Sequence, residues 1–261
     1  MTSVWLEGKK RRGGRGGGQP SGLDRRRITE VTVRLLDAEG LGKFSMRRLA
    51  AELNVTAMSV YWYVDTKDDL LELALDAAYG ELRLPGTETG IETGTGIETE
   101  TEDETGTGDD WRDQLRVLAG EYRALLVRHP WLSPLAGRFL NIGPNALSFS
   151  RAVQDVVRRT GLPAHRMTSA ISAVFQFVYG YGTMEGHYFA RAADVGMSPD
   201  DYYKHAVESV TGDPDAAHVV EDSKDIMAAR GGDTVAEMLG RDFDFALDLL
   251  IAGIEATAAR G

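Results

Sequence analysis

The feature that most constrains the fold of this chain is the stretch 45–64, which reads as two short helices joined by a tight turn. Ser45 and Thr56 stand where the two helices would begin, and their hydroxyl oxygens can accept hydrogen bonds from first-turn N–H groups. Asn54 lies at the turn, where a left-handed backbone is needed and Asn tolerates it. Ala50 is small where the helices must cross closely. Because these signals converge, we expect helix-turn-helix geometry rather than an ordinary helical hairpin within a core.

The flanking residues complete a small helical domain that we expect to span residues 23–85. A helix should begin at Asp24 and bury Ile28 and Leu35 on one face. After the two short helices, Thr66-Lys-Asp-Asp69 has the pattern of a capping box that opens a fourth helix. The stretch 45–64 is therefore predicted to sit between two longer helices.

The net charge of −11 is distributed unevenly along the chain. Residues 1–27 carry eight Lys and Arg against two acids, whereas residues 86–110 carry nine acids and no base. Residues 1–22, rich in glycine and base, are predicted to be a disordered basic arm, and residues 86–110 a disordered acidic linker. The linker is either a simple repeat expansion without function or an acidic mimic that competes with DNA for the arm.

Residues 111–261 have helical periodicity throughout, so the predicted fold class is all-α. Gly180, Gly182 and Gly186 fall within one long helix, where they require the close approach of a partner helix or a ligand. The last helix, from about Asp233, carries an apolar stripe that exceeds what one helix can bury against its neighbours. We therefore expect a homodimer. The stripe consists of Val235, Leu239, Phe243, Leu250 and Ile254.

Several classes of protein do not fit the composition. Cysteine is absent, which removes disulfides and cysteine-ligated metals. There is neither a signal peptide nor the roughly 18–20 uninterrupted apolar residues of a membrane span, so we expect a cytoplasmic protein with no membrane partner. A helical-bundle metalloenzyme would need repeated Glu-x-x-His pairs, and Asp215-Ala-Ala-His218 is a lone analogue. The prediction is a non-enzyme without metal or cofactor.

Residues 24–83 resemble the DNA-binding domain of the tetracycline-repressor (TetR) family, most closely its tetracycline-repressor-like branch. The resemblance rests on Ser45–Val64, Lys67 and the apolar helix 70–74. Residues 111–261, with His129-Pro130-Trp131 and the closing helix, are similar to that family's ligand-binding and dimer-forming domain. The acidic linker departs from the family pattern, in which the two halves are joined compactly. The resemblance implies a homodimer that binds a palindromic operator in double-stranded DNA and responds to a small-molecule ligand.

The resemblance also implies roles at matching positions of the DNA-binding domain, residues 23–85, which we call the reader. Arg47 would reach a base edge, and the front of the second short helix would face the major groove. Tyr61, Tyr63 and Lys67 would bind phosphates. Trp62 is expected to pack in the core, because such aromatics are usually buried. The basic arm would either enter an adjacent minor groove or attract phosphates loosely. The predicted DNA-binding residues are Lys9, Lys10, Arg11, Arg12, Arg15, Met46, Arg47, Thr56, Ala57, Met58, Ser59, Tyr61, Tyr63 and Lys67.

In residues 111–261, which we call the body, aromatic side chains occur with few polar groups. They predict a pocket for an apolar, polycyclic ligand, with core packing as the alternative for each residue. The predicted ligand-binding residues are Tyr122, Trp131, Phe139, Phe175, Tyr179, Thr183 and His187. The family's tetracycline binder has a metal-ligating His where Phe139 aligns, so a magnesium chelate is not expected. The predicted function is a repressor released from its operator by the ligand. An activator or a protein-responsive regulator on the same fold is the alternative.

Overall fold

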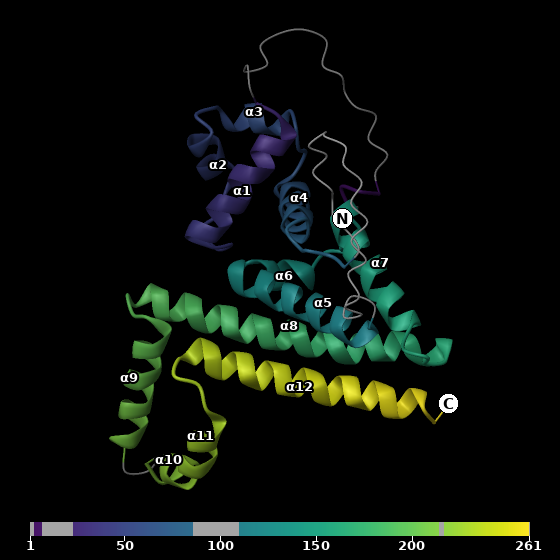
Figure 1. The fold of residues 1–261 in the computed structure, drawn as a ribbon. Coiled ribbons are helices and arrows are strands. Elements are labelled where there is room, and N and C mark those ends of the chain that lie inside the picture. The colour runs from purple at the N-terminus through teal and green to yellow at the C-terminus, as the bar shows by residue number, and fades with distance from the viewer. Residues whose placement is uncertain (1–2, 7–22, 86–109, 214–216, 261) are drawn as a thin grey trace, which may run out of the picture.

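The computed structural model describes four ranges of the 261-residue chain, residues 3–6, 23–85, 110–213 and 217–260. The regular elements in these ranges are all helices, which confirms the predicted all-α class (Figure 1). The predicted arm and linker fall largely on residues 7–22 and 86–109, which lie outside the described residues. None of the described helices has the combined length and apolar character that a membrane span requires.

Four helices form the N-terminal unit at the top of Figure 1, and α1 packs along α4. They are α1 (Arg25–Glu39), α2 (Met46–Glu52), α3 (Ala57–Tyr61) and α4 (Lys67–Tyr79). The Asp24 side chain caps α1 as expected, because its Oδ1 accepts a hydrogen bond of 2.7 Å from the Arg27 N–H. Thr66 and Asp69 form the predicted capping box at the start of α4. Ile28 and Leu70 are fully buried in the core of this unit.

Eight helices build the body below the N-terminal unit. They are α5 (Trp111–Arg128), α6 (Leu132–Ala136), α7 (Pro144–Arg158), α8 (Ala164–Asp194), α9 (Pro199–Thr211), α10 (Ala217–Asp222), α11 (Lys224–Arg230) and α12 (Val235–Ala258). The long helix α8 runs through the body, with α5 packed on one side and α12 beside it (Figure 1). Helices α9, α10 and α11 project from one end, and neither α9 nor α11 has a buried residue.

The helices α5 and α8 approach each other closely at two glycines. A Cβ on Gly182 would lie 3.1 Å from the Leu126 side chain, and one on Gly186 would lie 2.8 Å from the Leu126 carbonyl oxygen. The predicted close approach at these positions is therefore confirmed, and its source is a partner helix of the same chain. Gly180 has no such neighbour within 4 Å, and nothing in the structure explains it.

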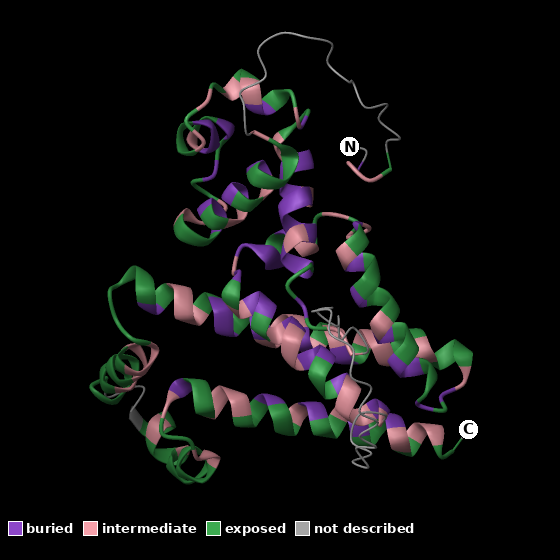
Figure 2. Ribbon diagram, turned by 45° about the horizontal axis from the view of Figure 1, so that its top comes forward, coloured by how far each residue is buried: buried purple, intermediate pink, exposed green. Residues whose placement is uncertain are grey.

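Helix α12 has two apolar faces. One face buries Val235, Phe243 and Ile254 against the rest of the body. The other leaves Phe245 at 67% and Leu249 at 60% exposure. Exposed segments recur along the whole of α12 in Figure 2. The apolar surface that the chain leaves uncovered on this helix is formed by Phe245 and Leu249. The stripe expected to be in excess is instead buried or half-buried within the chain at Val235, Leu239, Phe243, Leu250 and Ile254.

Candidate DNA-binding surface and ligand cavity

The turn between α2 and α3 has the local structure that its residues favour. Ser45 Oγ accepts a hydrogen bond of 3.2 Å from the Arg48 N–H, and Thr56 Oγ1 accepts one of 3.2 Å from the Ser59 N–H. Asn54 has a φ of 54°, in the left-handed region. Val60 is completely buried and anchors α3 to the core. The two caps and the turn residue are confirmed, and they orient α3 as an exposed short helix.

The front of α3 presents several of the predicted DNA-binding side chains to solvent. Met58 is 69% exposed and Tyr61 is 42% exposed, and Arg47 on α2 is also exposed. Trp62 is 74% exposed, so the expectation that it packs in the core is wrong. The reason is its register: it lies two positions from the buried Val60, which places it on the opposite side of the helix. Trp62 therefore extends the exposed surface of α3.

Three predicted DNA-binding side chains are committed to contacts within the protein. Met46 is only 8% exposed and belongs to the core, so its assignment as a DNA contact is wrong for the side chain. It opens α2 directly after the buried Phe44, on the inner side of that helix. The Tyr63 hydroxyl donates to the Leu23 carbonyl oxygen at 2.7 Å. Lys67 Nζ donates to the Phe44 carbonyl oxygen at 2.7 Å, which leaves two of its three protons for a phosphate.

A basic hollow on α1 adds residues that the sequence reasoning did not single out. It has a volume of about 500 Å³ and is lined by Arg26, Arg27 and Arg34 together with acidic neighbours. Arg26 is paired with Glu30 at 2.8 Å, whereas Arg27 and Arg34 are exposed on this face. The run Arg25-Arg26-Arg27 was the signal that could have found them. The predicted arm residues Lys9, Lys10, Arg11, Arg12 and Arg15 lie outside the described residues.

The reader and the body are joined by a polar cluster in which the buried His129 and Trp131 meet the partly exposed carboxylates of Asp37 and Glu81. Asp37 Oδ1 on α1 is 2.6 Å from His129 Nδ1 and accepts a second hydrogen bond of 2.6 Å from Trp131 Nε1. His129 Nε2 lies 3.1 Å from Glu81 Oε2. Burial lowers the pKa of His129, but the hydrogen bonds and charges of Asp37 and Glu81 outweigh burial and leave it raised. The cluster holds α1 against the end of α5.

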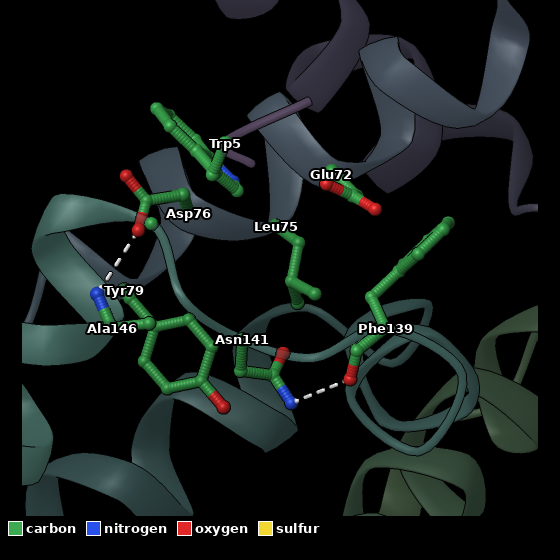
Figure 3. Close-up of a pocket in the computed structure, with 9 residues that line it drawn as sticks. Trp5, Glu72, Leu75, Asp76, Tyr79, Phe139, Asn141 and Ala146 are labelled. Carbon is green, nitrogen blue, oxygen red and sulfur yellow. Dashed lines mark hydrogen bonds between the residues drawn. The ribbon is translucent and has the colours of Figure 1, made fainter. Parts of the chain in front are cut away.

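A second junction ties α4 to the first turn of α7. Asp76 Oδ1 accepts hydrogen bonds from the N–H groups of Asn145 at 3.1 Å and Ala146 at 3.0 Å (Figure 3). Burial raises the pKa of Asp76, and the two backbone hydrogen bonds offset part of that rise. Gly143 is required beside this carboxylate, because a Cβ there would collide with it. The carboxylate thus caps α7 from a neighbouring helix.

A cavity of about 600 Å³ lies between α4, α7 and α8, and it opens to solvent. Its wall contains three aromatic rings, from Tyr79, Phe149 and Phe175, with a few polar groups around them. Phe149 and Phe175 meet edge to face with ring centroids 5.5 Å apart. The remaining lining residues are Asn141, Ala146, Ser150, Val153, Gln154, Val157, Arg158, Met167, Thr168 and Ile171. This volume and lining suit a small aromatic molecule.

Of the seven predicted ligand-binding residues, the cavity wall includes Phe175. Trp131 is instead buried at the junction with Asp37. Tyr179 donates its hydroxyl to the Ser133 carbonyl oxygen at 2.8 Å. His187 is exposed to solvent outside the cavity. These three residues therefore lie outside this cavity, because an aromatic residue at helical spacing carries no information about which neighbouring helix it faces.

The other three predicted ligand residues lie near the cavity or behind it. Tyr122 is buried in the second layer, 5.3 Å from the Phe149 ring centroid. Phe139 lines a smaller hollow next to the cavity. Thr183 is outside the cavity wall, and its Oγ1 is buried without a hydrogen-bond partner. The residues of α7 that form most of the wall were missed, since the pattern of α7 shows only an amphipathic helix.

Comparison with known proteins places both halves of the chain in one family. Residues 28–74 match the family "Bacterial regulatory proteins, tetR family", and residues 104–258 match the family "Tetracyclin repressor-like, C-terminal domain". An HTH-type transcriptional regulator of Saccharopolyspora erythraea is 33% identical over 242 residues, which cover 90% of this chain and 86% of that protein. The HTH-type transcriptional repressor DrrR1 of Streptomyces coeruleorubidus is 30% identical over 265 residues, covering 100% and 86%.

Among solved structures, the chain is similar to the TetR family protein ActR of Streptomyces coelicolor in complex with actinorhodin. The TM-score is 0.65 at 23% identity, with 91% of this chain and 97% of that chain covered, which shows a common fold. The family matches and the relatives extend over both the capped helix-turn-helix and the cavity-bearing body. The chain belongs to the TetR family of bacterial transcriptional regulators.

Proposed function

We propose that this protein is a dimeric cytoplasmic repressor that binds a palindromic operator and leaves it when a small aromatic ligand fills the cavity. The observation that carries the proposal is a capped, exposed α3 in a unit that two carboxylates tie to the body, the buried Asp76 and the partly exposed Asp37. A regulator that reads DNA with one half and a ligand with the other needs such a mechanical connection.

The DNA contact follows from what α2 and α3 expose. Arg47 supplies a guanidinium that can bind a guanine edge with two hydrogen bonds. Ala57 and Met58 offer apolar contact to a thymine methyl group, while Thr56, Ser59 and Tyr61 are polar partners at the groove and backbone. Lys67, Arg27 and Arg34 supply positive charge for phosphates. The basic arm with Lys9, Lys10, Arg11, Arg12 and Arg15 adds further positive charge near the duplex.

The ligand contact follows from the cavity wall. Tyr79, Phe149 and Phe175 favour a flat aromatic molecule over a flexible chain. Asn141 Oδ1 is buried at this wall without a hydrogen-bond partner, so a ligand hydroxyl or N–H can satisfy it. Such chemistry is compatible with actinorhodin, which is bound in the ActR structure.

Ligand binding can reach the reader through the first turn of α7. Ala146 lines the cavity, and its backbone N–H donates to Asp76 on α4. A ligand that pushes the start of α7 outward must move α4 or break this hydrogen bond. Because α4 begins at the phosphate-binding Lys67, its movement changes the position of the reader relative to the second subunit.

The dimer places two readers on one operator. Phe245, Leu249 and the 76%-exposed Met184 provide apolar surface on α12 and α8 for a second copy. Repression is supported by the name of the relative DrrR1, a transcriptional repressor. A two-fold dimer accounts for the expected palindromic operator.

The test is operator retention in a gel or by fluorescence anisotropy, first with actinorhodin and then with other polycyclic aromatic compounds. Val153→Trp fills the cavity from α7, so it should keep operator binding and lose release by the compound. Leu147→Trp on the same helix, at a side chain 52% exposed, is the matched control and should be released normally. Release of the Val153→Trp protein at the concentration that releases the unmodified protein would refute the proposal.

A further inference from the structure

The first described segment of the chain, Ser3–Leu6, is docked on α4 next to the ligand cavity. Ser3 Oγ donates a hydrogen bond of 2.6 Å to Glu72 Oε2, and the Val4 N–H donates one of 3.0 Å to the same oxygen. The Leu6 N–H donates to the Ser3 carbonyl oxygen at 3.0 Å, which closes a turn. Ser3 is 5% exposed, so its hydroxyl is buried against α4.

The turn directs the Trp5 side chain into a hollow between α4 and the segment before α7 (Figure 3). The hollow is lined by Trp5 and by residues that include Leu75, Asp76, Tyr79 and Phe139. The space left in this hollow is about 10 Å³, no more than a single water needs. The half-buried Trp5 therefore closes one side of a hollow in which little space remains, and we call Ser3–Leu6 the plug.

The plug and the ligand cavity share one wall. Tyr79, Asn141 and Ala146 line both the hollow around Trp5 and the cavity of about 600 Å³. Asn141 has a φ of 52° and an unpartnered buried Oδ1, so this part of the wall is held in an uncommon conformation. A group that enters the cavity at these three residues meets residues that also line the hollow beside Trp5.

We propose that the hollow on α4 is a binding site for the chain's own N-terminus, and that plug docking and ligand binding exclude each other. The proposal rests on the proposed function of the cavity as the ligand site. A ligand that occupies the shared wall displaces Trp5, and Ser3 then leaves Glu72. Because Glu72, Leu75 and Asp76 all lie on α4, loss of the plug also frees the helix that connects the reader to the body.

The expected size of the effect follows from a two-state equilibrium. If the docked plug is about ten times more populated than the free plug, the apparent affinity for a ligand is about tenfold lower than in a protein without it. The anchor is modest, with two hydrogen bonds on one carboxylate and one indole ring. A ligand can therefore overcome it, which a deeply buried strand or helix would not allow.

The experiment uses the full chain and 8-anilinonaphthalene-1-sulfonate, an aromatic dye whose fluorescence rises in apolar sites. Trp5→Ala and Glu72→Ala should each bind the dye at least threefold more tightly than the unmodified protein. Leu6→Ala is the matched control, because Leu6 belongs to the same segment but is 59% exposed, and it should change nothing. Equal affinity in all four proteins overturns the proposal.

A second measurement follows Trp5 directly by fluorine NMR of the protein labelled with 5-fluorotryptophan. The chain has four tryptophans, of which the 74%-exposed Trp62 is an internal reference for full exposure, and Trp5→Phe assigns the Trp5 signal. A soluble paramagnetic agent should broaden Trp5 less than Trp62 in the free protein, and equally after saturation with dye. A Trp5 signal as accessible as Trp62 before dye is added overturns the proposal.

The variant Val153→Trp separates this proposal from the one on which it rests. If it removes dye binding while Trp5→Ala has no effect, the plug is wrong and the cavity assignment stands. If it leaves dye binding unchanged, the cavity assignment fails, and the competition with the plug fails with it. Operator retention without any ligand tests DNA binding independently of both.

Discussion

Replacing Asp37 with Ala should destabilise the protein more than removing an exposed ion pair on α1 does, because Asp37 lies at the junction between the reader and the body. One oxygen of this carboxylate is the acceptor for both His129 Nδ1 and Trp131 Nε1, each at 2.6 Å. The two donors are 3% and 4% exposed as residues and depend on this acceptor, whose own side chain is 35% exposed. The substitution leaves the Trp131 Nε1–H without a partner, while His129 can give up its Nδ1 proton and keep the hydrogen bond between Nε2 and Glu81.

The magnitude follows from the cost of an unsatisfied buried donor, about 1–3 kcal/mol for each group. His129 can still use Glu81, so we expect Asp37→Ala to destabilise the protein by about 2–4 kcal/mol. Asp37→Asn keeps an acceptor oxygen and should cost about 1 kcal/mol. Glu30→Ala on the same helix removes the exposed pair with Arg26 and should cost no more than about 0.5 kcal/mol.

The junction should also make stability depend on pH. The folded state raises the pKa of His129, so the stabilisation from its protonated form is complete below the unfolded pKa of about 6.5. It is lost as the pH rises through the folded-state value. Asp37→Ala should flatten this decline, because it removes a main partner of the imidazolium.

Denaturant unfolding followed by circular dichroism, repeated from pH 5.5 to pH 8.5, measures both effects. The unmodified protein should lose stability across this range faster than Asp37→Ala. If Asp37→Ala costs as little as Glu30→Ala and leaves the pH profile unchanged, the His129 cluster does not hold the two units together.

Three further outcomes are expected. Arg47→Ala should cost about 1–3 kcal/mol of operator affinity and relax the base preference at one position per half-site. Lys67→Ala should weaken binding to all sequences evenly and reduce the slope of log affinity against log salt by about one unit per half-site. Equal, sequence-independent losses for both variants in binding titrations would contradict these roles. Gly143→Ala should destabilise by about 1–3 kcal/mol in thermal unfolding, because the new Cβ collides with a buried carboxylate; an unchanged melting temperature would contradict that clash. Leu249→Glu should shift sedimentation at micromolar concentration toward the monomer, since it charges an exposed apolar face; an unchanged sedimentation coefficient would remove that face from the dimer interface.

The parts of the molecule that could be predicted from sequence are those that depend on neighbouring residues along the chain. Ser45, Thr56 and Thr66 cap the N–H groups three positions ahead, and Asn54 adopts the turn conformation that its side chain tolerates. These interactions close within one helical turn, so no distant segment is needed to establish them. The all-α class and the starts of α1, α4 and α12 follow for the same reason.

What only the tertiary structure decided is which faces meet. Trp62 is exposed because α3 already buries Val60, and Trp131 serves the Asp37 junction because α1 folds back over the end of α5. Most of the cavity wall comes from α7, with Phe175 as the aromatic residue that α8 contributes, and Ser3 reaches Glu72 on α4 across almost seventy residues of sequence. Helical periodicity identifies an apolar face but not its neighbour, because many packing partners bury the same area with similar free energy. The contacts among distant helices, and with them the ligand site, are therefore properties of the assembled fold.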